Sequence, residues 1–226
     1  MIKIENLTKH YGNKLVLKNM SLTFEQGKVY GVVGENGAGK TTLFRCIAGL
    51  ESYEGSINSE IKPLKNYLGL LFTDPFFFKR MTGQEYIQLL LNARGIKVTA
   101  IEAKNIFNLP LNQYASTYST GMKKKLALTA ILLQENKIFI LDEPFNGVDI
   151  QSNIIIAEVL CELKKLGKTI IISSHIFSTL AETCDEIFLL KDGEIIKRVC
   201  KPDFETLEIE MKTFTIGNII DKLELK

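Results

Sequence analysis

Nine residues, GENGAGKTT at positions 34–42, constrain the fold of this chain more than any other stretch. They fit the pattern G-x-x-x-x-G-K-[ST] through Gly34, Gly39, Lys40 and Thr41. The apolar run KVYGVV precedes them and TTLFRCIAGL follows, which predicts a strand, a glycine-rich turn and a helix. Such a turn directs backbone amides and the positive end of the helix toward an anion. We therefore expect a diphosphate here, with Lys40 reaching the β and γ phosphates and Thr41 holding Mg²⁺.

Composition and charge describe an ordinary globular protein. The chain has 226 residues, 46% hydrophobic and 24% charged, which suits one large domain or a core with an appended lobe. Its 28 basic and 26 acidic residues give a net charge of +2, so we expect no nucleic-acid partner. The four cysteines form no C-x-x-C pair, so neither a zinc site nor a disulfide framework is expected. A membrane-spanning helix needs about 20 consecutive apolar residues, and no apolar run in this sequence is close to that length. If the protein acts at a membrane, we expect another chain to supply the membrane-spanning helices.

The order of apolar segments predicts an α/β fold. In the opening third, IKIENL, LVLKN, SLTFE and KVYGVV are typical of short strands. From about Thr82 to Gln134, the segments EYIQLLLNA, AIEAKNIFN and KKLALTAILLQ predict helices. The last third alternates KIFIL, IIIAEVLCELKKLG, KTIIISS, IFSTLAETC and EIFLLKDGEII, with a hairpin signal at Asp192-Gly193. Strands too apolar to face water on either side indicate a parallel sheet covered by helices.

Two polar positions follow buried strands and are candidates for catalysis. KIFILDEP ends in Asp142, expected to face Mg²⁺ through water, and Glu143, placed to polarise a water for attack on a γ phosphate. An acidic pair without function at a strand end is the alternative. KTIIISSH ends in His175, which would reach the same edge of the sheet and contact the γ phosphate or the attacking water. A histidine in this place is as often only a surface residue.

The stretch YSTGMKKK at positions 118–125 predicts a helix start. Ser119 or Thr120 would cap the helix. Ser119 and the amide of Gly121 would also present donors, which makes a second anion site on the same chain. The lysines Lys123–Lys125 are interpreted as mainly a solvated helix face. The chain would then have two anion sites but bind one nucleotide, which suggests that a nucleotide is shared between the anion sites of two subunits.

These motifs, in this order, resemble the ATP-binding cassette ATPases, the nucleotide-binding subunits of ABC transporters. The resemblance covers Met1 to about Val199. Tyr11 matches the aromatic residue that stacks on adenine, 34–42 the Walker A loop, 118–122 the signature, 138–143 Walker B, Asn146 to Asp149 the D-loop, and His175 the switch histidine.

The resemblance implies a P-loop NTPase core with a mostly parallel sheet, an N-terminal antiparallel β subdomain and an α-helical subdomain inserted at about 76–135. All of this would form one ABC ATPase domain over 1–226, with a tail at 201–226 that has no assigned role. The implied ligands are ATP and Mg²⁺. The residues implied for nucleotide are Tyr11, Gly34, Asn36, Gly37, Ala38, Gly39, Lys40, Thr41, Thr42, Ser119 and Gly121; for metal, Thr41 and Asp142; for catalysis, Glu143 and His175.

The resemblance also implies partners. In this family two cassettes pair head to tail, so Ser119 and Gly121 of one would close on the γ phosphate held by the other's Walker A loop. One set of motifs makes a homodimer plausible. The family's cassettes drive a membrane permease, which implies a cytoplasmic subunit, peripheral on the inner face of the membrane. The signature Tyr118–Met122 replaces the usual Leu-Ser-Gly-Gly-Gln and resembles cassettes paired with separately encoded export permeases, so export is expected.

The chain departs from the family pattern at Thr73, where a glutamine usually contacts Mg²⁺ and water and links the site to the membrane subunit. Since threonine is shorter, we expect slower hydrolysis or looser coupling. Phe76, Phe77 and Phe78 follow; they would either pack into the helical lobe or line the groove for a permease helix.

Two other functions remain open at this stage. An ABC-type ATPase acting on ribosomes or DNA would typically carry two cassettes or long coiled-coil insertions, and this sequence shows neither. A small-molecule phosphotransferase would leave the signature unexplained.

Overall fold

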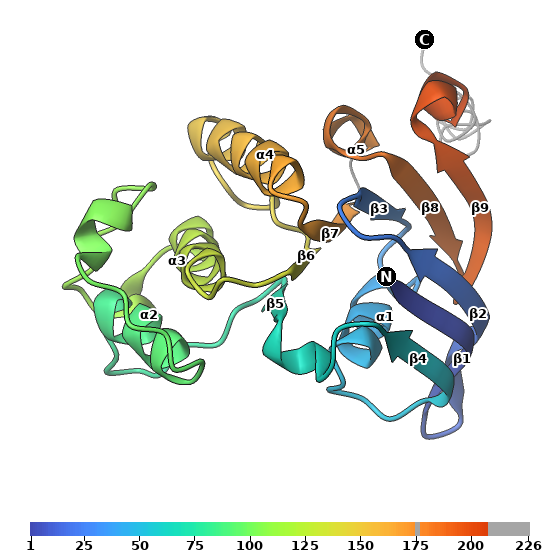
Figure 1. The fold of residues 1–226 in the computed structure, drawn as a ribbon, viewed down its shortest axis with the longest axis horizontal. Coiled ribbons are helices and arrows are strands. Elements are labelled where there is room, and N and C mark those ends of the chain that lie inside the picture. Colours follow the sequence, from blue (N-terminus) through green and yellow to red (C-terminus); the bar gives the residue numbers. More distant parts are fainter. Residues whose placement is uncertain (175–176, 208–226) are drawn as a thin grey trace, which may run out of the picture.

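The computed structural model describes residues 1–174 and 177–207, which form two β-sheets with helices on their faces (Figure 1). The strands are β1 Ile2–Tyr11, β2 Lys14–Phe24, β3 Val29–Val33, β4 Glu54–Ser59, β5 Leu68–Leu71, β6 Ile138–Asp142, β7 Thr169–Ser174, β8 Glu186–Lys191 and β9 Glu194–Cys200. The α-helices are α1 Lys40–Ile47, α2 Gly83–Asn92, α3 Thr120–Leu132, α4 Ile150–Lys165 and α5 Phe177–Thr183. Short 3₁₀ helices are η1 Leu64–Asn66, η2 Ile101–Lys104, η3 Ala115–Thr117 and η4 Lys201–Asp203.

The two sheets confirm the expected fold class. The smaller sheet is antiparallel, in the order β2-β1-β4. The larger sheet has the order β5-β6-β7-β3-β8-β9 and is parallel apart from β9, which pairs antiparallel with β8. The order places β6 and β7, which precede the candidate catalytic residues in the sequence, on the same side of β3. The carboxyl ends of these parallel strands meet at one edge, which is where a ligand site is expected in such sheets.

The central strands β3, β6 and β7 of the larger sheet are buried on both faces, and their side chains alternate between two cores. In β3, Tyr30 and Val32 belong to a core shared with α1 and the smaller sheet. Val29 and Val33 belong to the second core, which includes residues of α2, α3, α4 and α5. Successive side chains of a strand point to opposite faces, so a strand with a core on each side is apolar along most of its length. This explains the continuous apolar runs in the sequence.

Helices α2 and α3 lie side by side beyond the β5 edge of the larger sheet (Figure 1). Both belong to the segment 76–135 that the sequence suggested as a helical subdomain, and that division of the chain stays a prediction. Helix α2 begins with a capping box, in which Thr82 Oγ1 accepts from the Glu85 amide and the Glu85 carboxylate accepts from the Thr82 amide.

Two local expectations were wrong. The segments LVLKN and SLTFE form the single strand β2, which continues through an irregular register at Asn19, where φ is 49° and the amide donates to Thr8 Oγ1. The segment AIEAKNIFN is not an α-helix: only η2 forms. The Asn105 side chain donates to the carbonyl and accepts from the amide of Leu109, which replaces helical bonding. The strands β4 and β5 were not expected.

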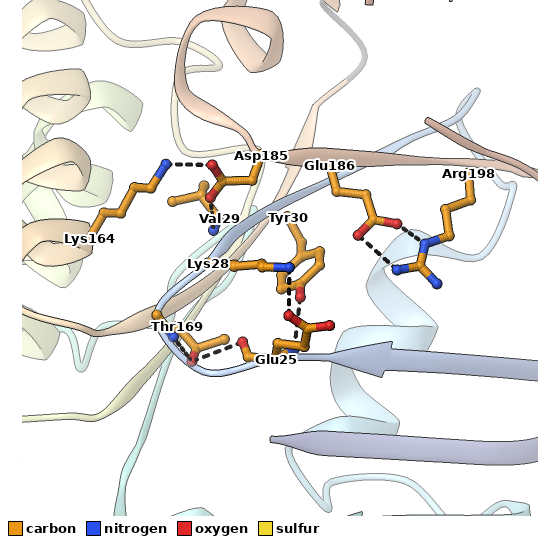
Figure 2. A network of polar contacts seen from close by, with 10 residues as sticks. Glu25, Lys28, Val29, Tyr30, Lys164, Thr169, Asp185, Glu186 and Arg198 are labelled. Carbon is orange, nitrogen blue, oxygen red and sulfur yellow. Dashed lines mark hydrogen bonds and ion pairs between the residues drawn. The ribbon is translucent and has the colours of Figure 1, made fainter. Parts of the chain in front are cut away.

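A polar network ties the amino ends of the central strands to α4 (Figure 2). Asp185, just before β8, accepts from the Val29 amide at 2.9 Å and from Lys164 Nζ at 2.5 Å. Lys164 lies near the carboxyl end of α4, so Asp185 joins that helix to the start of β3. Figure 2 also shows Glu186 paired with Arg198 across β8 and β9. The strands that carry the site are thus fixed at the edge opposite to it.

We predict that Asp185→Ala lowers the free energy of unfolding by about 2 kcal/mol, because it leaves the buried Val29 amide without an acceptor. Lys164→Met should cost about 1 kcal/mol or less, since the ion pair it removes is partly exposed. Urea unfolding of each variant measures both values.

Asp185→Asn is the matched control, because its amide oxygen still accepts from Val29 while the ion pair with Lys164 is lost. It should resemble Lys164→Met. Equal losses for Asp185→Ala and Lys164→Met would show that the backbone contact contributes nothing.

Candidate nucleotide site

The loop between β3 and α1 has a shape that only glycines allow. Gly37 and Gly39 have φ values of 86° and 112°, in the region that disfavours a Cβ. A Cβ on Gly34 would lie 2.3 Å from the carbonyl oxygen of Leu190, and one on Gly39 would lie 2.8 Å from Leu17 Cδ2. No side chain caps the first turn of α1. The sequence pattern is therefore required by the loop, and it leaves a helix N-terminus facing the site.

Lys40 is 7% exposed and its ammonium group lies within the loop. Nζ donates to the carbonyl oxygens of Gly34 at 2.6 Å and Glu35 at 3.2 Å. It also lies 3.7 Å from Glu143 Oε1, across the site. A buried cation held by carbonyls and a nearby carboxylate is available to an incoming phosphate, which offers stronger charge-assisted bonds than a carbonyl does.

The Asp142 carboxylate, 1% exposed, collects three hydroxyl groups. Oδ2 accepts from Thr41 Oγ1 at 2.6 Å and from Thr73 Oγ1 at 2.7 Å. Oδ1 accepts from Ser173 Oγ at 2.5 Å. These residues come from β6, α1, the segment after β5, and β7. Four parts of the chain thus meet at one carboxylate.

Sequence reasoning missed Ser173. It is fully buried in β7, directly opposite Asp142 in the parallel register. Its hydroxyl donates to the Asp142 carboxylate and accepts from the Glu143 amide at 2.9 Å. Aligning the ends of the two strands around KIFILD and KTIIISS would have indicated this neighbour.

Glu143 adopts an unusual backbone conformation next to that carboxylate. Its φ is 50°, a value that residues other than glycine, asparagine and aspartate seldom adopt. The residue is 8% exposed. Strain of this kind persists where surrounding contacts over-determine the structure. Here the Ser173 hydroxyl holds the amide, and the side chain reaches toward Lys40.

These groups surround a cavity of about 420 Å³. Most of the residues suggested for nucleotide and metal line it. The lining residues are Val16, Glu35, Asn36, Gly37, Gly39, Lys40, Thr41, Thr42, Thr73, Asp142, Glu143 and Asn146. Of the other suggested residues, Gly34 and Ala38 are buried in the wall of the loop. His175 lies outside the described residues.

Tyr11 lies beside this cavity rather than in its lining. It ends β1, is 42% exposed, and Lys9 Nζ sits 4.6 Å from the centre of its ring. The pKa of its hydroxyl is raised, mainly by burial, and the same group interacts with Glu51 and Thr42. The interaction with Thr42 brings the Tyr11 hydroxyl near the start of α1.

The signature lies on α3, and its first residues fold as expected for a capped helix. Ser119 Oγ accepts from the Met122 amide at 3.2 Å. A Cβ on Gly121 would lie 2.5 Å from the carbonyl oxygen of Gly147, so glycine is required for the helix to approach the D-loop. Among the described residues that line the cavity, none belongs to the signature.

The expectation of a solvated lysine face was wrong for Lys124, which is 2% exposed. Its ammonium group donates to the carbonyl oxygens of Glu143 at 2.7 Å and Asn146 at 2.8 Å. Lys125 donates to Asp149 and Ser152. The pKa of Asp149 lies well below its usual range, mainly because the Ser152 amide donates to its carboxylate and because Lys125 bonds it.

A glycine-rich loop between a parallel strand and a helix, a buried lysine in that loop, and a carboxylate from a neighbouring strand define a P-loop nucleotide-binding site. The family model described as ABC transporter matches residues 17–146. The bacitracin transport ATP-binding protein BcrA of Enterococcus faecalis is 34% identical over 215 residues, 88% of this chain and 69% of that protein. The lantibiotic transport ATP-binding protein SrtF of Streptococcus pyogenes is 33% identical over 208 residues, 87% and 89% of the two chains.

A solved structure has the same fold. It is a dimeric ATP-binding cassette in a post-hydrolysis state bound to ADP and Pi, 21% identical, with a TM-score of 0.80 over 89% of this chain and 99% of that one. This chain belongs to the ABC transporter family. It is an ATP-binding subunit and an ATPase. Among the residues that the structure describes, no helix has the length and apolar character needed to cross a bilayer.

We predict that Thr73→Gln raises ATP turnover by about threefold to tenfold, because a glutamine side chain is long enough to make the contacts with Mg²⁺ and water that the family resemblance implies at this position. Steady-state phosphate release at saturating ATP measures the change.

Thr73→Val is the control, since it also releases the Asp142 oxygen that Thr73 binds. It should not raise turnover. If the two variants accelerate the reaction equally, release of Asp142 is the cause and the glutamine has no role. An unchanged rate in Thr73→Gln would contradict the hypothesis that the short side chain of Thr73 slows hydrolysis.

Proposed function

We propose that this chain is a Mg²⁺-dependent ATPase subunit that pairs head to tail with a second copy of itself and drives export through a separate membrane permease. The observation that carries the proposal is the separation of the two candidate anion sites. The described lining of the Walker A cavity contains no signature residue, although Ser119 and Gly121 resemble the family's γ-phosphate donors. A second copy placed head to tail would supply them.

The residues of the Walker A loop, the start of α1 and Tyr11 have roles in binding ATP. The Walker A loop and the N-terminus of α1 hold the phosphates, and Lys40 turns from the carbonyls of Gly34 and Glu35 to the β and γ phosphates. The loop residues Asn36, Gly37, Ala38, Gly39 and Thr42 surround the same phosphates. Tyr11, beside Thr42, stacks on the adenine.

The oxygen donors around Asp142 fit a magnesium ion. The Thr41 hydroxyl and the Asp142 carboxylate are 2.6 Å apart, and hard oxygen ligands of this kind suit Mg²⁺. When bound with ATP, Mg²⁺ neutralises charge on the phosphate oxygens. We assign Thr41 and Asp142 to it, with Ser173 keeping the carboxylate oriented.

Hydrolysis follows from the position of Glu143. Its carboxylate accepts a proton from a water molecule as the water oxygen attacks the γ phosphorus; the bond from that phosphorus to the β–γ bridging oxygen breaks and ADP leaves. Lys40 lies 3.7 Å from Glu143 Oε1 and stabilises the charge that develops on the phosphates. His175 positions the γ phosphate, and the partner's Ser119 and Gly121 complete the site.

The aromatic residues after Thr73 support a contact with a permease. Phe77 is partly buried and packs against Tyr86 of α2. Phe76 and Phe78 are 73% and 54% exposed and contact each other edge to face. Exposed aromatic side chains on an otherwise folded lobe are typical of partner sites. The relatives named for bacitracin and lantibiotic transport, together with the signature variant, support a role in export at the inner face of the membrane.

We predict that the Glu143→Gln form, captured with Mg-ATP from detergent-solubilised membranes of the native host, brings with it a multi-span membrane protein in stoichiometric amount. This substitution removes the base while leaving the nucleotide contacts, so the closed dimer should persist. Mass spectrometry of the captured material identifies the partner.

The control is the same variant carrying Phe76→Ala and Phe78→Ala. These residues are exposed, so the chain should still fold and bind ATP but should lose the membrane protein. Ribosomal proteins or a soluble partner in its place would contradict the transport function. Retention of the membrane protein by the phenylalanine variant would place the contact elsewhere.

A further inference from the structure

Lys124 is the most completely buried cation among the described residues, and the roles proposed above do not use it. It lies in the second turn of α3, near the positive end of the helix, where a cation is unfavourable. Burial lowers its pKa, while the nearby charges of Asp74, Glu143 and Asp142 favour the protonated form. Its hydrogen-bond partners are backbone carbonyls, those of Glu143 and Asn146. A buried charge is costly, so it stabilises the structure only where its contacts are well formed.

The two carbonyls flank the turn that follows the general base. Glu143 carries the carboxylate proposed to act on water, and Asn146 lines the nucleotide cavity. The Asn146 amide also donates to the Glu143 carbonyl, which closes the turn. A cation that bridges both ends of this turn fixes the backbone whose unusual φ directs the Glu143 side chain.

Two further contacts join the same helix to the same loop. Gly121 lies against the carbonyl oxygen of Gly147 with no room for a Cβ. Lys125 pairs with Asp149 at 2.9 Å and with Ser152 at 3.1 Å, at the start of α4. The first turns of α3 and residues 143–149 therefore pack as one unit.

We propose that Lys124 is a positioning residue for hydrolysis: it locks the turn of Glu143 to the helix that begins with the signature. This inference rests on the proposed function, in which the signature of each copy closes on the other's nucleotide. A signature helix that closes on one nucleotide then carries with it the general base of the other site. Lys124 would couple the two sites through contacts within a single chain.

The test compares Lys124→Met with the wild-type protein in ATP turnover, in ATP affinity measured by fluorescence of a bound nucleotide analogue, and in melting temperature. Methionine has a similar length but donates no hydrogen bond. Since Lys124 does not line the cavity, ATP affinity should stay within about twofold. The maximal rate should fall about tenfold or more, the scale expected for a displaced catalytic group.

Lys124→Gln provides a graded variant, because its amide can still donate to a carbonyl. Its rate should lie between those of the wild type and Lys124→Met, and it replaces the methionine variant if that chain does not fold. Lys123→Met is the matched control, since it removes a positive charge from the same turn without touching residues 143–149. It should retain the wild-type rate.

The outcomes separate this inference from the proposed function. A Lys124→Met protein with the wild-type maximal rate would overturn the inference. So would a rate that falls only in proportion to lost ATP affinity or to the fraction unfolded at the assay temperature. A wild-type chain that binds ATP but never forms a dimer would instead contradict the proposed pairing, and the comparison of rates would still decide whether Lys124 positions Glu143.

Discussion

The site depends on one buried carboxylate and the hydroxyl groups gathered on it. Asp142 accepts from Thr41, Thr73 and Ser173, so it joins the helix after the Walker A loop to β6, β7 and the segment leading to the helical lobe. A buried carboxylate without such donors would be strongly unfavourable. Because the donors come from separate elements, the elements must keep their positions for the carboxylate to remain hydrogen-bonded and oriented. The geometry of the cavity is thus fixed by polar contacts as well as by the apolar cores.

The contacts beyond Asp142 extend this constraint in two directions. Through Ser173 it reaches the amide of Glu143, whose backbone conformation is unusual. Through Lys124 and Gly121 the loop that follows reaches the signature helix. Glu143, the proposed base, and the signature helix are therefore linked within a chain, although in the proposed dimer they act on different nucleotides. This arrangement would suit a dimer in which ATP hydrolysis at the two sites is coupled.

The sequence was sufficient for the fold class and for most of the residues that line the cavity, because both depend largely on local patterns. Continuous apolar strands indicated the parallel sheet. The glycines at 34–42 predicted the phosphate-binding loop, because its positive φ values and close contacts exclude residues with a Cβ. Asp142 and Glu143 were visible as polar residues after a buried strand. The roles of these residues in binding and catalysis stay predictions.

What the sequence could not show arises from contacts between distant segments. Ser173 and Lys124 look like ordinary strand and helix residues, and only the register of β6 with β7 and the packing of α3 on the D-loop reveal their partners. The segment around Asn105 has helical apolar spacing, but its side chain bonds the backbone in place of a helix. Thr73 departs from the family pattern, but the length of its side chain did not predict its hydrogen bond to Asp142.

The most direct test of the central claim is the mass in solution of purified Glu143→Gln protein, measured by sedimentation velocity with and without Mg-ATP. We expect a monomer without nucleotide and a dimer once ATP occupies the site, because in the proposed pairing the partner's signature completes each γ-phosphate site. A protein that is saturated with ATP and remains a monomer would contradict it.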